Sequence, residues 1–410
     1  MNRHRPEVAD VFASSGSNYQ AAYGTSATQR QILRDLAVCR SAALGGHKEQ
    51  CEQCGHEEIS YNSCRNRHCP KCQASSRAQW LEAKAEDLLN VPYFHVVFTL
   101  PSDIGPLALQ NKRLVYGVLF RAASETLSTI AKDHKHLGAN IGFLTVLHTW
   151  GQNLHHHPHI HCVVPGGGIA LDDSHWVKCR ENFFLPVRVL SRMFRQKFLA
   201  YLREAFNNDD LRFHGMLETL AERRTWCRLL AKLGSSDWVV YAKPPFGGPT
   251  QVLKYLARYT HRVAISNRRL VSFENGKVTF RWKDYAHGNR NRTMTLDADE
   301  FIRRFLLHSL PKGFQRIRQY GFLANRVREQ KLSLCRELLS DSSDSNEAAM
   351  PGDGVTVENT ENDVEPCRET TMTEEVCSAC QKGRMVFVEL IRPSDSCCDQ
   401  RLSSPPFNTS

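Results

Sequence analysis

The spacing of apolar residues changes along the first third of the chain from the period of a helix to that of a strand. Residues 30–46 and 75–92 place apolar side chains at helical intervals, and each segment ends on a helix stop, two glycines or a proline. Residues 93–102 are rich in β-branched and aromatic residues, as strands are. A long amphipathic helix is then predicted over about 111–136.

The middle of the chain interleaves further strands and helices. Asn275-Gly276 predicts a hairpin, and no glycine-rich nucleotide loop is present in the sequence. The pattern predicts an α+β fold with a mainly antiparallel sheet. Strands are expected at 141–151, 157–165 and 237–245, and helices at 187–206, 211–233 and 249–266.

The C-terminal part differs in composition from the rest. A charged helix is predicted after about residue 326, followed by an acidic tail too poor in apolar residues to become ordered. Residues 377–393 follow as a small terminal unit with one CxxC pair. We therefore predict three consecutive domains, 1–90, 91–325 and 326–410.

Charge is distributed unevenly along the chain. The 410 residues carry a net charge of +10, but residues 337–376 hold twelve acidic residues and one basic residue, which leaves about +21 on the remainder. Such a surplus favours a polyanionic partner, usually nucleic acid. The sequence has neither a leader-like N-terminal apolar segment nor an apolar run long enough to span a bilayer, so we expect a cytoplasmic protein with no membrane partner.

Two CxxC pairs lie close together near the N-terminus. Four thiolates in this spacing are typical of a closed, structural zinc site, which we expect to belong to a zinc-ribbon-like domain. Cys64 and His68 lie between the pairs and are alternative ligands, and Arg65 and Arg67 are candidate phosphate contacts. The predicted zinc ligands are Cys51, Cys54, Cys69 and Cys72.

Histidines alternate along the strand predicted at 157–165. A strand turns alternate residues to one face, so His157, His159 and His161 share a face and are positioned to bind one cation. Such a site takes Mg²⁺ or Mn²⁺ at a phosphate, or zinc at a water molecule. Gln152 is a further candidate ligand.

Two tyrosines are spaced four residues apart in the helix predicted at 249–266. Tyr255 and Tyr259 therefore share one helix face. Nearby cations favour the phenolate, which is the nucleophilic form of tyrosine. The cations of this helix, which are also candidate DNA contacts, are Lys254, Arg258 and Arg262.

These motifs resemble a known family. The His159-Ile160-His161 motif followed by a YxxxY helix resembles the HUH single-strand endonucleases, and the phrases YNSCRNRHCPKCQ, LHTWGQNLHHHPHIHCVVPGGG and VLKYLARYTHRVAISN resemble insertion-sequence transposases of the IS-ninety-one type. The resemblance covers about residues 30–325. It implies a ferredoxin-like or RRM-like HUH nuclease domain behind an N-terminal zinc-binding, DNA-binding domain.

The resemblance also implies rolling-circle transposition of a bacterial insertion sequence. Tyr255 and Tyr259 are then the nucleophiles, and His159 and His161 bind Mg²⁺ or Mn²⁺. Related nucleases complete the metal site with a third residue, for which His157 and Gln152 rank equally and His155 is also available. Single-stranded DNA at element ends and target is the expected substrate, and no nucleotide cofactor is expected. Association with the nucleoid is expected for such an enzyme.

Other functions remain open from the residues alone. A rolling-circle replication initiator or a relaxase would use the same histidines and tyrosines. A non-catalytic zinc-ribbon regulator would need neither, and a histidine-zinc hydrolase would use water as its nucleophile. Phe273, Phe280, Trp282 and Tyr285 are interleaved with basic residues over 254–292 as base-stacking candidates.

Overall fold

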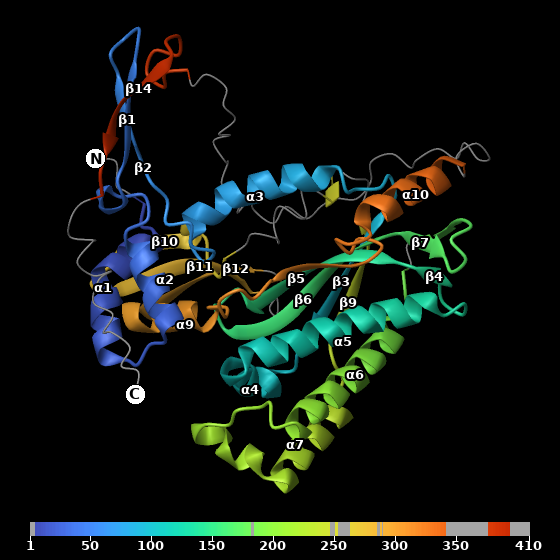
Figure 1. The fold of residues 1–410 in the computed structure, drawn as a ribbon. Coiled ribbons are helices and arrows are strands. Elements are labelled where there is room, and N and C mark those ends of the chain that lie inside the picture. Colours follow the sequence, from blue (N-terminus) through green and yellow to red (C-terminus); the bar gives the residue numbers. More distant parts are fainter. Residues whose placement is uncertain are drawn as a thin grey trace, which may run out of the picture. The chain divides into compact units, whose positions relative to one another are not determined.

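A computed structural model of the chain shows two compact units, and each is described by itself (Figure 1). The first comprises the described residues within Met1–Gln79, His261–Ser309 and Asp363–Ser410, and the second those within Trp80–Thr260 and Leu310–Asn362. The structure describes residues 5–181, 184–246, 251–252, 263–284, 288, 290–341 and 376–393.

A five-stranded antiparallel sheet forms the centre of the second unit. Its strand order is β13-β5-β6-β3-β9. Strand β6 pairs with β5 on one side and β3 on the other, so the histidine-bearing strand lies in the middle of the sheet. The strands are β3 (Tyr93–Thr99), β5 (Gly142–Trp150), β6 (His156–Pro165), β9 (Val240–Phe246) and β13 (Ile317–Gly321).

Helices α5 (Lys112–Lys132) and α6 (Val187–Asn207) cover one face of this sheet (Figure 1). The even-numbered residues Ile160, Cys162 and Val164 of β6 point to that face and are buried with both helices in the main core. The other elements on this side are α4 (Gly105–Gln110), α7 (Arg223–Ser235) and the 3-10 helices η2 (Ser102–Ile104) and η3 (Gly215–Ala221).

The opposite face of the sheet carries a second, smaller core. Val163 of β6 and Val146 of β5 pack there with Leu332 and Cys335 of helix α10 (Arg328–Asp341). Both faces of the sheet are thus covered at this end of β6, which explains the continuous apolar sequence after His161. Three short strands complete the unit, β4 (Ala139–Asn140), β7 (Gly167–Ala170) and β8 (Trp176–Lys178).

The first unit combines helices with two three-stranded sheets. Phe12 of α1 contacts Phe305 of α9 at 5.1 Å between ring centroids, and Phe301 of α9 contacts Phe280 of β11. The sheet orders are β10-β11-β12 and β14-β1-β2. The helices are α1 (Val8–Ala22), α2 (Ala27–Ala37), α3 (Pro70–Ala85), which continues into the second unit, and α9 (Ala298–Leu307), with η1 (Ala42–Leu44) and η4 (Asn267–Arg269). The strands are β1 (Gly46–Cys51), β2 (Glu57–Tyr61), β10 (Leu270–Glu274), β11 (Lys277–Asp284), β12 (Arg290–Asp297) and β14 (Met385–Ile391).

The predicted α+β class is confirmed, with an antiparallel sheet and the hairpin around Asn275-Gly276. The expected helix 30–46 ends at Ala37, and Arg40 follows with a left-handed φ of 56°. The expected helix 211–233 is divided into η3 and α7, and Gly215, with φ 57°, is the first residue of η3. No helix among the described residues is long and apolar enough to cross a membrane.

The two units differ from the three consecutive domains predicted, 1–90, 91–325 and 326–410. Strands β10–β12 belong with the N-terminal helices, because α9 links them to α1 through the aromatic contacts above. Strand β14 pairs with β1, which lies more than 300 residues earlier. Most of the acidic tail and of the expected helix 249–266 lies outside the described residues.

Replacing Leu202 with alanine should strongly destabilise the second unit. Leu202 of α6 is fully buried in the main core, so the change leaves a cavity and should lower the free energy of unfolding by about 2–5 kcal/mol. Met216→Ala is the matched control, because Met216 is 96% exposed and its loss should change stability by less than about 0.5 kcal/mol. Denaturant unfolding measures both, and equal effects would refute this assignment of the core.

Candidate functional site

Three histidines meet on one face of the central sheet. His148 of β5 lies directly opposite His159 of β6, and His161 is two residues further along β6. Directly paired and alternate residues point to the same face of a sheet, so all three rings do so. Their nearest ligand atoms all lie within 4.8 Å of one another, a spacing that one metal ion can bridge.

This histidine group lies where the smaller core ends. His148 and His161 are buried, with 3% and 7% of their surface exposed, whereas His159 is half-buried. Val146 and Val163 neighbour them on the same sheet face and belong to that core. The apolar part of β5 and β6 therefore fixes the strands, and their other ends present the imidazoles.

Contacts with neighbouring groups orient two of the rings. The Nδ1–H of His159 donates a hydrogen bond of 2.7 Å to the carbonyl of His157, which leaves Nε2 as the ligand atom. Nδ1 of His161 shares a hydrogen bond of 2.8 Å with Nε2 of His95 on β3, and these two rings stack. Burial, with smaller contributions from Lys243 and His159, lowers the pKa of His95 to about 3, so His95 is neutral at physiological pH.

The third member of the histidine group, His148, was not predicted from the sequence. His157, one of the two candidates, is exposed at the start of β6 and is not a member, although its ring centroid lies 5.2 Å from that of His159. Gln152 lies in the turn between β5 and β6. The available signal was His148 near the end of a predicted strand, but only the pairing register places it opposite His159.

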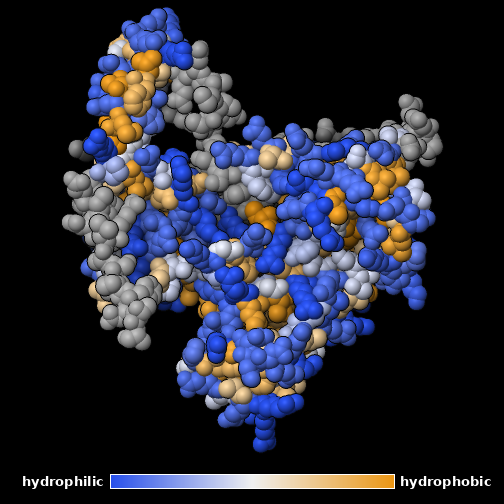
Figure 2. All heavy atoms as spheres, in the orientation of Figure 1, coloured by the Kyte–Doolittle hydropathy of each residue, from blue (hydrophilic) through white to orange (hydrophobic). Residues whose placement is uncertain are grey.

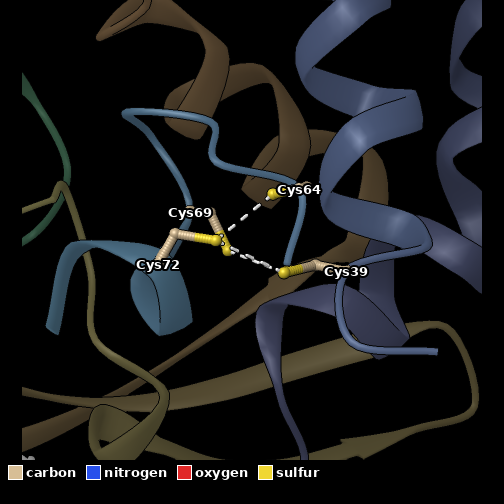
Figure 3. A group of neighbouring side chains, drawn as sticks. All are labelled: Cys39, Cys64, Cys69 and Cys72. Atoms are coloured by element: carbon tan, nitrogen blue, oxygen red, sulfur yellow. Dashed lines mark hydrogen bonds between the residues drawn. The ribbon is translucent and has the colours of Figure 1, made fainter. Parts of the chain in front are cut away.

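A second group consists of four cysteines in the first unit (Figure 3). Cys39, Cys64, Cys69 and Cys72 come from the turn after α2, the loop before α3 and the first turn of α3, and their sulfur atoms lie within 4.8 Å of one another. The Sγ of Cys39 is 3.5 Å from those of Cys69 and Cys72, and the Sγ of Cys64 is 3.6 Å from that of Cys72.

This cysteine group fits a tetrahedral zinc ion with four thiolate ligands. Hydrogen bonds with Cys39, Cys64 and Cys69 lower the pKa of Cys72. Hydrogen bonds with Cys64 and then Cys69 lower the pKa of Cys39 to about 7. Hydrogen bonds with Cys39, Cys64 and Cys72 raise the pKa of Cys69. Four adjacent thiolates repel one another unless a cation neutralises them. Zinc at this position would join α2 to α3, a structural role.

The single four-cysteine site predicted from Cys51, Cys54, Cys69 and Cys72 is wrong. The structure separates its two CxxC pairs, placing Cys69 and Cys72 with Cys39 and Cys64, and Cys51 and Cys54 with Cys377 and Cys380. Cys64 had been an alternative ligand. Cys39 was missed because it lies 25 residues before Cys64 and forms no CxxC pair.

The predicted DNA contacts near this cysteine group differ in accessibility. Arg65 is exposed and adopts a left-handed φ of 52°. Arg67 is half-buried, and burial lowers its pKa. Arg65 is therefore the more accessible candidate for a phosphate.

The predicted nucleophiles, Tyr255 and Tyr259, lie outside the described residues, as do Lys254, Arg258 and Arg262. Val252, three residues before Tyr255, is described and is fully buried in the smaller core. Val252 thus lies on the sheet face that carries the histidines.

Of the four aromatic stacking candidates, Phe280 is excluded. It is fully buried against Phe301 and Arg269, so it is a core residue of the first unit. Phe273 and Trp282 are half-buried, and Tyr285 lies outside the described residues.

Comparisons with known proteins decide the family. Residues 142–331 match the family model described as "Putative transposase", and residues 11–100 match the model described as "Transposase zinc-binding domain". The chain is 30% identical to "Transposase for insertion sequence element IS801" of Pseudomonas savastanoi pv. phaseolicola, over 75% of this chain and 73% of that protein. The chain belongs to the IS91 family of transposases.

A second relative of this transposase is similar over nearly its whole length. "Putative transposase y4qJ" of Sinorhizobium fredii (strain NBRC 101917 / NGR234) is 55% identical over 95% of this chain and 96% of that protein. No solved structure gives a significant match.

Removing the His95 ring nitrogens should weaken metal binding without removing a member of the histidine group. In His95→Phe, His161 loses the neighbour that orients it, and the dissociation constant for Mn²⁺ should rise about 10- to 100-fold. Titration monitored by electron paramagnetic resonance measures free Mn²⁺. His156→Phe is the control: His156 is half-buried and has a 2.8 Å hydrogen bond, to Tyr116, but lies outside the group. Equal changes in the two variants would contradict a positioning role for His95.

Proposed function

We propose that this transposase nicks single-stranded DNA by tyrosine attack and transfers the strand in a rolling-circle reaction of an insertion sequence. The observation that carries the proposal is the group of His148, His159 and His161, held on two paired central strands with His159 partly accessible. A purely structural histidine site would have no need of an accessible member.

The buried Val252 supports the assignment of the two nucleophiles. Val252 precedes Tyr255 by three residues in the sequence and packs on the histidine face of the sheet, and three residues of chain span at most about 11 Å. Tyr259 follows four residues later, and on the helix predicted from sequence it shares a face with Tyr255.

The reaction follows from these groups. A divalent ion bound by the three imidazoles would polarise the scissile phosphate. The phenolate oxygen of one tyrosine attacks phosphorus, the P–O3′ bond breaks, and the leaving 3′-oxygen takes up a proton. The products are a 5′-phosphotyrosine and a free 3′-hydroxyl. The second tyrosine can then open another junction while the first is still esterified.

The donor set bears on which ion is used. Imidazole nitrogen suits transition-metal ions, whereas Mg²⁺ prefers oxygen ligands and retains much of its water. We therefore propose Mn²⁺ ahead of Mg²⁺ at the histidine group. The positive surplus outside the acidic segment would hold the DNA strand, with Arg65 as one phosphate contact.

A double substitution of the tyrosines tests the nucleophile assignment. Phenylalanine keeps the ring and removes only the attacking oxygen, so Tyr255→Phe/Tyr259→Phe should form no covalent DNA adduct. Each single variant keeps one tyrosine hydroxyl and should still form a covalent adduct. Wild type and variants are incubated with single-stranded element ends and Mn²⁺, denatured, and mapped by peptide mass spectrometry. An adduct on another residue, or one that persists in the double variant, would overturn the assignment.

Loss of His148 should be as damaging as loss of His159 or His161. His148→Ala removes one of three ligands and should lower the cleavage rate at least about 100-fold, more than the loss of a group that only orients a ligand. His157→Ala is the matched control, because His157 is exposed on β6, the strand of His159 and His161, and its loss should leave cleavage within a few-fold of wild type. Single-turnover cleavage measures both rates. The reverse order of sensitivity would restore His157 as the third ligand.

A further inference from the structure

A second group of four cysteines is assembled from two segments more than 300 residues apart in the sequence. Cys51 is the last residue of β1 and Cys54 lies in the turn after it, whereas Cys377 and Cys380 precede β14. The four sulfur atoms all lie within 4.8 Å of one another. The Sγ of Cys51 is 3.7 Å from that of Cys380, and the Sγ of Cys54 is 3.6 Å from that of Cys377. Cys377 and Cys380 lie outside the residues that match the zinc-binding family model.

The two CxxC segments fold into similar turns, of which the second is one residue longer. The N–H of Cys51 donates to the carbonyl of His56, and the Cys51 carbonyl accepts from the N–H of Gly55. The C-terminal segment repeats this pattern, since the N–H of Cys377 donates to the carbonyl of Gly383, and the Cys377 carbonyl accepts from the N–H of Gln381. Two like turns thus present two thiols each to a common centre.

Backbone amides also point at the sulfur atoms. The N–H of Gln53 lies 3.4 Å from the Sγ of Cys51, and that of Gly383 lies 3.3 Å from the Sγ of Cys380. Such donors stabilise thiolate sulfur, the form that binds metal. A side chain at Gly383 would meet the Cys51 sulfur at 2.4 Å, so only glycine fits between the two turns.

The sheet β14-β1-β2 lacks a hydrophobic core that would hold its strands together. Its buried residues within the strands are Gly46 and Cys51, whereas Phe387 and Leu390 of β14 are 63% and 69% exposed. Apolar side chains are visible on its surface in Figure 2. A small three-stranded sheet without a buried face needs another source of stability, and metal ligation is a common one.

We propose that Cys51, Cys54, Cys377 and Cys380 bind a second zinc ion, which completes a zinc ribbon from the first and last described segments. Strand β14 then pairs with β1 from Gly46 opposite Ile391 to Cys51 opposite Met385. The ion closes the chain between residues 54 and 377 into a loop. This proposal does not depend on the tyrosine chemistry.

Metal content of the full-length protein tests the proposal. Zinc is counted in a His159→Ala/His161→Ala background, in which the histidine group cannot hold the ion. There the protein with its native cysteines should contain two zinc ions per chain, one in each four-thiolate group, and Cys377→Ser/Cys380→Ser should contain one. The control Cys227→Ser removes an exposed cysteine outside both groups and should keep two. A single zinc with the native cysteines, or two in the double cysteine variant, would overturn the second site.

The coordination sphere provides a readout that does not depend on loss of the fold. Cys380→His replaces one thiolate by an imidazole, which zinc also accepts, so this variant should keep two metal ions per chain. After exchange with Co²⁺, its thiolate-to-metal absorption should weaken relative to wild type, because one thiolate fewer is bound. An unchanged Co²⁺ spectrum, or a disulfide between Cys51 and Cys380 in the unreduced wild type, would contradict the proposal.

The closed loop can be tested by cutting the chain. A site-specific protease sequence inserted between Met350 and Pro351 permits cleavage of the otherwise full-length, zinc-loaded protein. The C-terminal fragment should co-elute with the rest in gel filtration and separate after treatment with a zinc chelator. In the Cys377→Ser/Cys380→Ser background it should separate without chelator. Separation from the zinc-loaded wild-type background would refute the link.

Discussion

The antiparallel pairing of β5 with β6 is the constraint on which the histidine site depends. It sets His148 opposite His159 and leaves His161 on the same face. A shift of this register by one residue would turn His148 to the other face of the sheet, into the core with α5 and α6. The same shift would remove Val146 and Leu144 from the smaller core, so the packing of that core and the histidine group require the same register.

Because one strand register serves both the apolar cores and the histidine group, the histidines can be packed closely. Imidazoles in contact gain little stability from one another, and their strands are fixed by apolar residues further along. His95 extends the arrangement to β3, where a buried neutral ring contacts His161. Three adjacent strands thus contribute to one site, which makes its geometry rigid before a ligand arrives.

The first unit relies on a different kind of constraint. Cys39, Cys64, Cys69 and Cys72 are drawn from three short segments around α2 and α3. The second cysteine group joins segments more than 300 residues apart, beside a sheet with little apolar burial. The second group therefore lies beside strands with little apolar burial, whereas the five-stranded sheet of the second unit has a core on each face.

Local patterns predicted most elements but not how distant segments associate. Strands β3, β5 and β6 were recognised from their own residues, because strand formation leaves a local pattern of apolar positions. The third member of the histidine group was not, since strand pairing is a tertiary property. The cysteines illustrate the same limit: CxxC spacing identified metal-binding turns, yet the partner of each turn depends on the fold, and Cys39 carries no spacing pattern.

The assignment of His148 through strand pairing is tested most directly by locating the bound ion. Anomalous X-ray diffraction at the manganese absorption edge, from crystals of the full-length protein grown with Mn²⁺, gives its position and ligands. The account predicts a manganese peak bonded to ring nitrogens of His148, His159 and His161. A peak whose protein ligands include His157 or Gln152 in place of His148 would contradict it.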